Sequence, residues 1–258
     1  MIIDEKKSNY GLAAIIYAVL FFFAGTFILI FLTNIFSNIH QVDKLVIIEG
    51  LAATDYSNYT ETEILVLSKV NGWGNLVIYL LSLIGIIVFL KHDIKEDIKD
   101  FIQTAKSETG LLFAVAFGFL VVTYVVDIIV SQFVPVSENQ NTIVQIFTGG
   151  GALPMVIATV ILAPIVEEYI YRKCVFALKP HFGKGMCYVV SILAFTLPHM
   201  LSTPMDDIFT WIIQCVPYAT SGFLLCLIYD NFKENTCVPI VVHMLNNLVA
   251  TLLVFMVV

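Results

Sequence analysis

The sequence predicts an all-α fold: a polytopic transmembrane bundle of about seven spans, with one further amphipathic helix lying on the membrane surface. Two observations lead to this prediction. Hydrophobic residues make up 59% of the chain and charged residues 13%, with a mean hydropathy of +0.91, values far from those of a soluble domain. Long apolar runs also recur along the chain, separated by short polar segments. The expected partner of most of its surface is therefore the lipid bilayer.

The apolar runs set the expected spans. Most approach the ~20 residues that cross a bilayer as a helix, and the second run can begin as early as Ile64. Between the first and second runs, the segment 33–73 is polar and acidic and is expected outside the membrane. Neither a soluble domain nor a repeat is visible, so residues 1–258 are expected to form a single membrane domain. The seven runs are 11–32, 75–90, 110–130, 154–178, 186–203, 208–229 and 237–258.

The surface helix is predicted between the second and third spans, over residues 91–107. Ile94, Ile98, Phe101 and Ile102 follow one another at i, i+4, i+7 and i+8, which places them on one face of a helix, while lysines occupy the other face. This pattern is typical of a helix that lies in the membrane interface.

Charge indicates orientation and excludes one class of partner. The net charge is −7 and the basic residues are spread singly, so nucleic acid is not an expected partner. With seven spans, most basic loops fall on one side, and the positive-inside rule then places the N-terminus in the cytoplasm and the C-terminus outside. A multi-pass protein of the cell membrane is expected. The five cysteines form no CxxC pair, which favours neither a disulfide framework nor a thiolate metal site.

The fourth span contains a cluster of charged residues, Glu167, Glu168 and Arg172. A charge near the bilayer centre costs roughly 2.5–3.5 kcal/mol on insertion scales, so such a cluster must face protein or water. Glu168 and Arg172 are i,i+4 on a helix and are expected to form an ion pair. Glu167 points about 100° away around the helix and stays available for chemistry.

Three further polar side chains, His199, His243 and Asn247, lie within the fifth and seventh spans. Counted from the cytoplasmic ends at about 1.5 Å per residue, Glu167, His199 and His243 lie roughly 16, 20 and 9 Å deep, which is compatible with one shared cavity. His243 and Asn247 are i,i+4 and share a helix face, whereas Asn246 does not.

The residue types suit hydrolysis of an amide bond by activated water. A carboxylate in a low-dielectric cavity can take a proton from water, histidine titrates near neutral pH, and an asparagine amide can donate to an oxyanion. A metal version stays open, with Zn2+ held by Glu167, His199 and His243 and an open fourth position. Each polar residue also has a purely structural alternative, since histidine and asparagine often form hydrogen bonds between membrane helices.

Three motifs resemble those of the CPBP family of intramembrane proteases, also called the CAAX-protease and bacteriocin-processing or Abi family. They are EExxxR at 167–172, FxxxH at 195–199 and HxxxN at 243–247, in order on successive late spans, so the catalytic core is expected over about 150–250. The resemblance implies that Glu167 and His199 activate water, that His243 and Asn247 stabilise the oxyanion, and that Glu168 and Arg172 support them.

The family resemblance also implies a substrate, a peptide or a lipidated protein. Members remove C-terminal tripeptides from prenylated proteins in eukaryotes, and in bacteria they are linked to peptide processing and to self-immunity against bacteriocins. The family is described both as metalloprotease and as glutamate-dependent protease, so zinc dependence stays open here too. The prediction is thus an intramembrane, CAAX prenyl endopeptidase-like protease.

The sequence is also compatible with other functions. A non-catalytic membrane immunity or scaffold protein of the same fold is the main alternative. A rhomboid-like serine protease would use Ser221 and His243, but this would leave the Glu-Glu-Arg cluster unexplained. The HExxH signature of site-2-type zinc proteases is absent, and no inverted repeat suggests a transporter.

Overall fold

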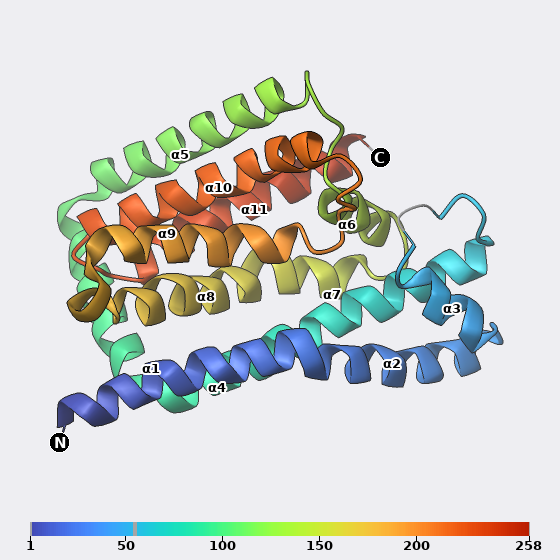
Figure 1. Cartoon of the computed structure of the whole chain (residues 1–258), viewed down its shortest axis with the longest axis horizontal. Coiled ribbons are helices and arrows are strands. Elements are labelled where there is room, and N and C mark those ends of the chain that lie inside the picture. The colour runs from blue at the N-terminus through green and yellow to red at the C-terminus, as the bar shows by residue number, and fades with distance from the viewer. Residues whose placement is uncertain (1, 54–55, 258) are drawn as a thin grey trace.

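The computed structural model describes residues 2–53 and 56–257, and within these ranges every regular element is a helix (Figure 1). The all-α prediction is therefore confirmed. Met1, Asp55 of the acidic segment and Val258 at the expected end of the last span lie outside the described residues. The α-helices are α1 (Ile2–Val19), α2 (Gly25–His40), α3 (Lys44–Gly50), α4 (Glu61–Ser107), α5 (Thr109–Val130), α6 (Glu138–Thr148), α7 (Ala152–Val156), α8 (Ala163–Glu168), α9 (Lys179–His199), α10 (Ile208–Asn231) and α11 (Cys237–Val257), with π-helical turns η1 (Leu20–Ala24), η2 (Ile157–Leu162) and η3 (Tyr169–Cys174).

Six helical stretches in the described part of the chain are long and apolar enough to cross a membrane, so the polytopic helical bundle is confirmed. The remaining expected span, 186–203, falls mostly in α9, which packs along α10 and ends at His199 rather than at Thr203. Met200 and Leu201 already form a turn, and the turn-forming residues Ser202 to Pro204 come next. The six stretches are Asn9–His40, Glu61–Ser107, Thr109–Val130, Ala152–Cys174, Ile208–Asn231 and Cys237–Met256.

The segment 33–73, which is polar and acidic in sequence, is largely helical. α2 continues to His40, and α4 begins at Glu61 with a capping box in which Glu63 N–H donates to the Thr60 hydroxyl and Thr60 N–H donates to the Glu63 carboxylate. The reason is a small second core. Ile47 of α3 packs against Leu67 and Val70 of α4, so these helices extend together beyond the neighbouring elements (Figure 1).

The amphipathic segment 91–107 continues α4 after a kink at Leu90, whose φ of −115° and ψ of 18° are not helical. Beyond the kink the chain turns across the end of the bundle near the N-terminus (Figure 1). Ile94 and Phe101 pack against the main core, while Ile98 and Ile102 are exposed. This position is the one expected of a helix lying along a membrane surface.

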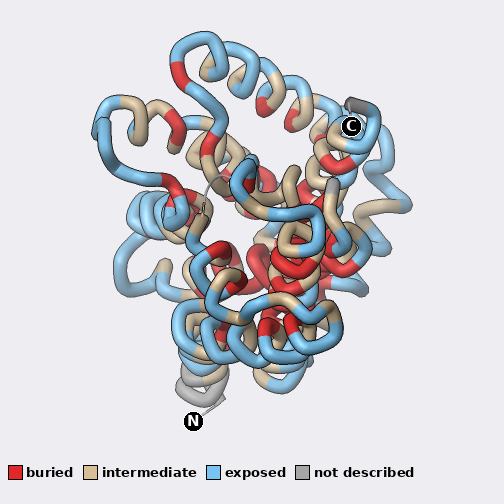
Figure 2. Tube along the Cα trace, turned by 90° about the vertical axis from the view of Figure 1, so that its right-hand side faces the viewer, coloured by how far each residue is buried: buried red, intermediate tan, exposed pale blue. Residues whose placement is uncertain are grey.

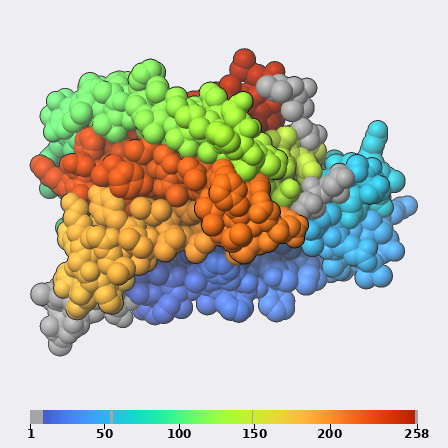
Figure 3. Space-filling view, turned by 45° about the horizontal axis from the view of Figure 1, so that its top comes forward, coloured from blue at the N-terminus to red at the C-terminus, as the bar shows by residue number. Residues whose placement is uncertain are grey.

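The central element is the continuous helix formed by α7, η2, α8 and η3, running from Ala152 to Cys174. It is the most buried of the candidate spans: 67% of the residues in its most apolar 18-residue stretch are buried inside the protein. Figure 2 shows the same distribution along the chain: buried residues gather where the inner helices meet, and exposed residues lie outside. In Figure 3, α5, α10 and α9 lie side by side over one face. The charged cluster thus lies on a helix that is surrounded by others.

The three glycines at 149–151 bring the chain into backbone contact with α4. Gly151 N–H donates to the Ser68 hydroxyl at 2.8 Å, and the same hydroxyl donates to the Ile146 carbonyl at 2.9 Å. A Cβ atom on Gly151 would lie 1.9 Å from the Ser68 carbonyl oxygen, a distance that no side chain can tolerate. Only glycine therefore allows the central helix to begin this close to α4.

We expect Gly151→Ala to destabilise the protein by about 1–3 kcal/mol, because the added methyl group must push α4 and the entry of the central helix apart. Gly118→Ala is the matched control, since nothing lies within 4 Å of the position of its added Cβ. That change should stabilise α5 by about 0.5–1 kcal/mol. Denaturant unfolding in detergent measures both, and equal stability of the two variants would contradict the close packing at Gly151.

Candidate active site

The central helix is irregular next to the charged cluster, and sequence causes the irregularity. In η2 the Ala163 N–H bonds to the Ala158 carbonyl, five residues back, instead of four. Pro164 follows, and because it has no N–H it cannot donate the next hydrogen bond of this pattern, to the Thr159 carbonyl. The Thr159 carbonyl instead accepts a hydrogen bond from Asn247 Nδ2 of α11 at 2.9 Å. The helix distortion therefore fixes Asn247 against the central helix.

Glu168 and Arg172 form the predicted i,i+4 ion pair, with Arg172 Nε 3.2 Å from Glu168 Oε2. Both side chains are fully buried, at 0% exposure. Glu168 Oε1 lies 3.0 Å from His243 Nδ1, and Arg172 Nη2 donates to the Gly222 carbonyl of α10 at 3.2 Å. The acid thus joins the central helix to α11, while the arginine joins it to α10.

Phe195, the first residue of the FxxxH motif, packs among the polar groups. Its ring lies 4.8 Å from the Arg172 guanidinium carbon, a cation–π distance, and its centroid lies 5.6 Å from the His243 ring. The His199 ring is 5.0 Å away, one turn further along α9. Phe195 therefore separates Arg172 from the cavity and supports both histidines.

Glu167 lies on a different side of the central helix from Glu168, as predicted. Tyr79 of α4 donates a hydrogen bond of 2.7 Å to Glu167 Oε1, and His243 Nε2 lies 3.9 Å from Glu167 Oε2. Glu167 is 3% exposed, yet it lines a cavity of about 790 Å3. One carboxylate oxygen is thus held by a phenol, and the other lies beside a histidine nitrogen.

The cavity brings together all four residues predicted to act on a substrate. Glu167, His199, His243 and Asn247 each contribute to its wall, from the central helix, α9 and α11. Glu168 and Arg172 do not line it and lie behind Glu167 and His243. The expectation that Asn246 would not share this face is wrong: Asn246 also lines the cavity, because it lies three residues after His243 and i,i+3 residues are neighbours on a helix.

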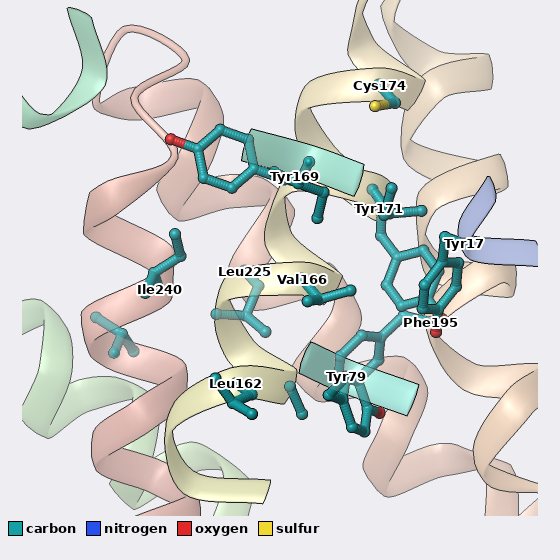
Figure 4. Packing of buried hydrophobic residues seen from close by; sticks show 14 of the residues in the cluster. Tyr17, Tyr79, Leu162, Val166, Tyr169, Tyr171, Cys174, Phe195, Leu225 and Ile240 are labelled. Carbon is teal, nitrogen blue, oxygen red and sulfur yellow. The ribbon is translucent and has the colours of Figure 1, made fainter. Parts of the chain in front are cut away.

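Sequence reasoning missed the tyrosines around Glu167. Tyr79, Tyr17 and Tyr171 line the same cavity, and the hydroxyls of Tyr17 and Tyr171 are 2.7 Å apart. Figure 4 shows these three rings on one side of the central helix together with Phe195, while Tyr169 points to the other side. Tyr171 could have been found by its i,i+4 spacing from Glu167, whereas Tyr79 is a lone tyrosine in an apolar span.

The three residues considered for zinc line one cavity without converging on a common point. Among the residues with described placement, no three His, Cys, Asp or Glu side chains form a group that could hold a metal ion. His243 Nδ1 faces Glu168, and its Nε2 is directed towards Glu167. As they stand, these side chains do not fit a three-ligand zinc site. Ser221 also lines the cavity, but the ring nitrogens of His243 contact the two glutamates, which does not favour the serine-protease alternative.

Part of the chain is similar to a known family of membrane proteases. Residues 149–249, which hold all three motifs, match the family model described as "Type II CAAX prenyl endopeptidase Rce1-like". The matched part of the chain is thus similar to the CPBP family, which its three motifs also resemble. A relative, the membrane-embedded CAAX protease MroQ of Staphylococcus aureus, is 27% identical over 223 residues, 84% of this chain and 85% of MroQ. An uncharacterized protein of Mycoplasma capricolum is 26% identical over 204 residues, 71% of this chain. The match covers 57% of the Mycoplasma protein, and no solved structure matches.

We expect Arg172→Met to cost about 3–5 kcal/mol of stability, because it leaves the Glu168 carboxylate buried without its guanidinium partner. Lys184→Met provides the control, since it breaks the more exposed Lys184–Asp230 pair and should cost less than about 1 kcal/mol. Both are measured by denaturant unfolding in detergent. Similar small losses for the two variants would show that the Glu168–Arg172 pair contributes little to the fold.

Proposed function

We propose that this protein is an intramembrane endopeptidase of the CAAX-protease type, which hydrolyses a peptide bond of a membrane-associated peptide or lipidated protein. The observation that carries the proposal is the Glu167 carboxylate in a cavity between helices, held by Tyr79 and flanked by two histidines from other helices. A buried acid in such a position is costly and is expected at a functional site. Similarity to the CPBP family and the name of the S. aureus relative support the same activity.

Glu167 and His199 act on the water in this mechanism. Water lies in the cavity against the free face of the Glu167 carboxylate, and its oxygen attacks the carbonyl carbon of the peptide while its proton passes to Glu167 or His199. The acquired proton is then transferred to the leaving amine, which completes hydrolysis. Tyr79 acts as a positioning residue, because its hydroxyl holds one oxygen of Glu167 and directs the other towards the cavity.

His243 and Asn247 stabilise the oxyanion. Glu168 faces His243 Nδ1, so the Nε2 atom is directed to the cavity, where it donates when the ring carries both protons. Asn247 uses one amide hydrogen on the Thr159 carbonyl, and a primary amide has a second hydrogen to donate. Glu168 and Arg172 support this pair from behind. Each step of this proposed mechanism is carried by side chains that line the cavity.

Removing the base tests the proposal. Purified protein in detergent is given a panel of three peptides: a farnesylated C-terminal CAAX peptide, a bacteriocin leader peptide and an unprenylated amphipathic signalling peptide. We expect wild type to cleave at least one, and Glu167→Gln and His199→Ala each to reduce the rate by at least ~100-fold, because general acid–base groups typically contribute 10²–10⁴-fold. Chelator should leave the wild-type rate unchanged. Mass spectrometry of the products gives the cleavage site.

Two results would contradict this mechanism. Loss of cleavage on chelation, restored by Zn2+, would assign Glu167, His199 and His243 to metal binding. Binding of a peptide without cleavage, unaffected by Glu167→Gln, would identify a non-catalytic immunity or scaffold protein, since that change keeps size and polarity but removes the base. The stability of each variant is checked in parallel, so that unfolding is not read as lost catalysis.

The role of Tyr79 is tested by Tyr79→Phe. A hydrogen bond to a charged group contributes about 1.5–3 kcal/mol, so the loss should lower kcat by up to roughly 10- to 150-fold with little change in KM. Tyr17→Phe is the matched control, because it removes a hydroxyl from the same cavity that bonds Tyr171 rather than the carboxylate. Equal losses in the two variants, or a change in KM alone, would remove Tyr79 from the positioning of Glu167.

A further inference from the structure

We propose that the side chains of Asn71 and Asn75 of α4 form an amide track, which binds the main chain of an extended peptide next to Glu167. This proposal rests on the proposed function and adds a binding subsite to it, beyond the bond that is cut. Both amides line the cavity of about 790 Å3 that contains Glu167. Three properties of these side chains support the subsite: their place on α4, the hydrogen-bonding groups they leave free, and their spacing.

The amide track forms one stripe on α4 with Tyr79. Asn71, Asn75 and Tyr79 follow one another at i, i+4 and i+8, which places them on one face of the helix, and all three line the cavity. The stripe ends at the reacting groups, because the Tyr79 hydroxyl donates to Glu167 Oε1 at 2.7 Å. Since α4 packs along the central helix from α7 to α8, the two amides lie on the cavity wall that leads to Glu167.

The two amides do not join α4 to another helix. Asparagine in membrane helices commonly holds two helices together, as Asn247 does by donating to the Thr159 carbonyl of the central helix. Asn71 Nδ2 and Asn75 Nδ2 instead donate to carbonyls of α4 itself, four residues back, each at 3.0 Å. Among the described residues, neither side chain forms a hydrogen bond with another helix. A role in helix packing therefore does not account for them.

Each amide keeps the groups that pair with a peptide. A primary amide has two N–H donors and a carbonyl oxygen that accepts. One donor of each side chain is used on α4, which leaves the second N–H and the oxygen for a ligand. A residue of an extended chain presents its N–H and its C=O on the same edge, as in the pairing of neighbouring strands. One asparagine side chain can therefore pair with both main-chain groups of one peptide residue.

The spacing of the two amides matches that of an extended peptide. Four residues of a helix rise about 6 Å, and two residues of an extended chain rise about 6.6 Å. Only every second residue of such a chain directs its main-chain groups to the same side, so each step along the stripe meets a residue of that kind. Counted from Tyr79 beside Glu167, Asn75 meets the peptide residue about two positions from the cut bond, and Asn71 the residue about four positions away.

This mode of binding defines a substrate class. Hydrogen bonds to the main chain do not read side chains, so the amide track accepts varied sequences provided that the segment is extended. Proline has no N–H and cannot complete the pairing with an asparagine side chain. The substrate class is thus an extended peptide segment of varied sequence, without proline at the two positions that meet Asn75 and Asn71.

Asn71→Leu and Asn75→Leu test the amide track, because each removes the amide at similar size. Asn34→Leu is the matched control: Asn34 Nδ2 makes the same kind of bond, to the Ile30 carbonyl of its own helix α2, and does not line the cavity. On whichever of the three peptides wild type cleaves, each cavity variant should raise KM about 3- to 10-fold and change kcat less than twofold, as expected for lost binding contacts. Asn34→Leu should change neither constant. Denaturant unfolding in detergent checks that all three variants are folded.

N-methylated peptides identify the pairing. The cleaved peptide is methylated on the main-chain nitrogen of the second or the fourth residue from the cut bond, on each side of that bond in turn. On one side, methylation of the second residue should raise KM at least threefold for wild type and leave it unchanged for Asn75→Leu. Methylation of the fourth residue should do the same for wild type and Asn71→Leu. Unchanged KM in both variants, or equal effects of methylation on wild type and variants, would overturn the amide track.

Failure of the proposed function would give a different result. A protein that cleaves none of the three peptides contradicts that function, and fluorescence anisotropy of the labelled peptides then measures Kd for wild type and the same variants. We expect Asn71→Leu and Asn75→Leu each to raise Kd about 3- to 10-fold, with Asn34→Leu equal to wild type. Equal Kd values for all four proteins, or no binding by wild type, would overturn the amide track.

Discussion

Glu168 lies between two partners deep in the bundle: Arg172, one turn further along the same helix, and the His243 ring of α11. Apolar side chains give little preference for one helix arrangement over another in lipid, because the surroundings are apolar as well. Polar contacts that can form in only one register are therefore what positions these helices. Through Glu168 and Arg172 the central helix is tied to α11 and to the Gly222 carbonyl of α10, and Phe195 packs α9 onto the same guanidinium.

Two adjacent glutamates thereby acquire different environments. Glu168 is enclosed by Arg172 and His243 and does not line the cavity, while Glu167 accepts a hydrogen bond from a tyrosine hydroxyl and lines the cavity. This division follows from helix geometry alone, since neighbouring side chains diverge by about 100°. Neighbouring acids with separate surroundings are a recurring way for enzymes to assign a structural and a chemical task to the same residue type.

The features that could be predicted well from the sequence are contacts within one helix and the bounds of long apolar helices. The Glu168–Arg172 pair depends only on i,i+4 spacing, and α5 (Thr109–Val130) follows an apolar run with clear limits. Features set by packing between distant helices were missed. The placement of Tyr79 beside Glu167 and the second core that extends α2 and α4 each depend on contacts across the bundle. No periodicity within one segment encodes these contacts.

The distortion at Pro164 has a consequence for substitutions at position 247. The carbonyl that accepts from Asn247 is available because the helix has shifted register and proline has no hydrogen to offer it. The Asn247 amide, which we propose stabilises the oxyanion, is thus oriented by a defect in the neighbouring backbone. The side chains at 164 and 247 therefore depend on each other through the backbone carbonyl of residue 159: repairing the helix would release the amide, and replacing the amide would leave a carbonyl unsatisfied inside the bundle.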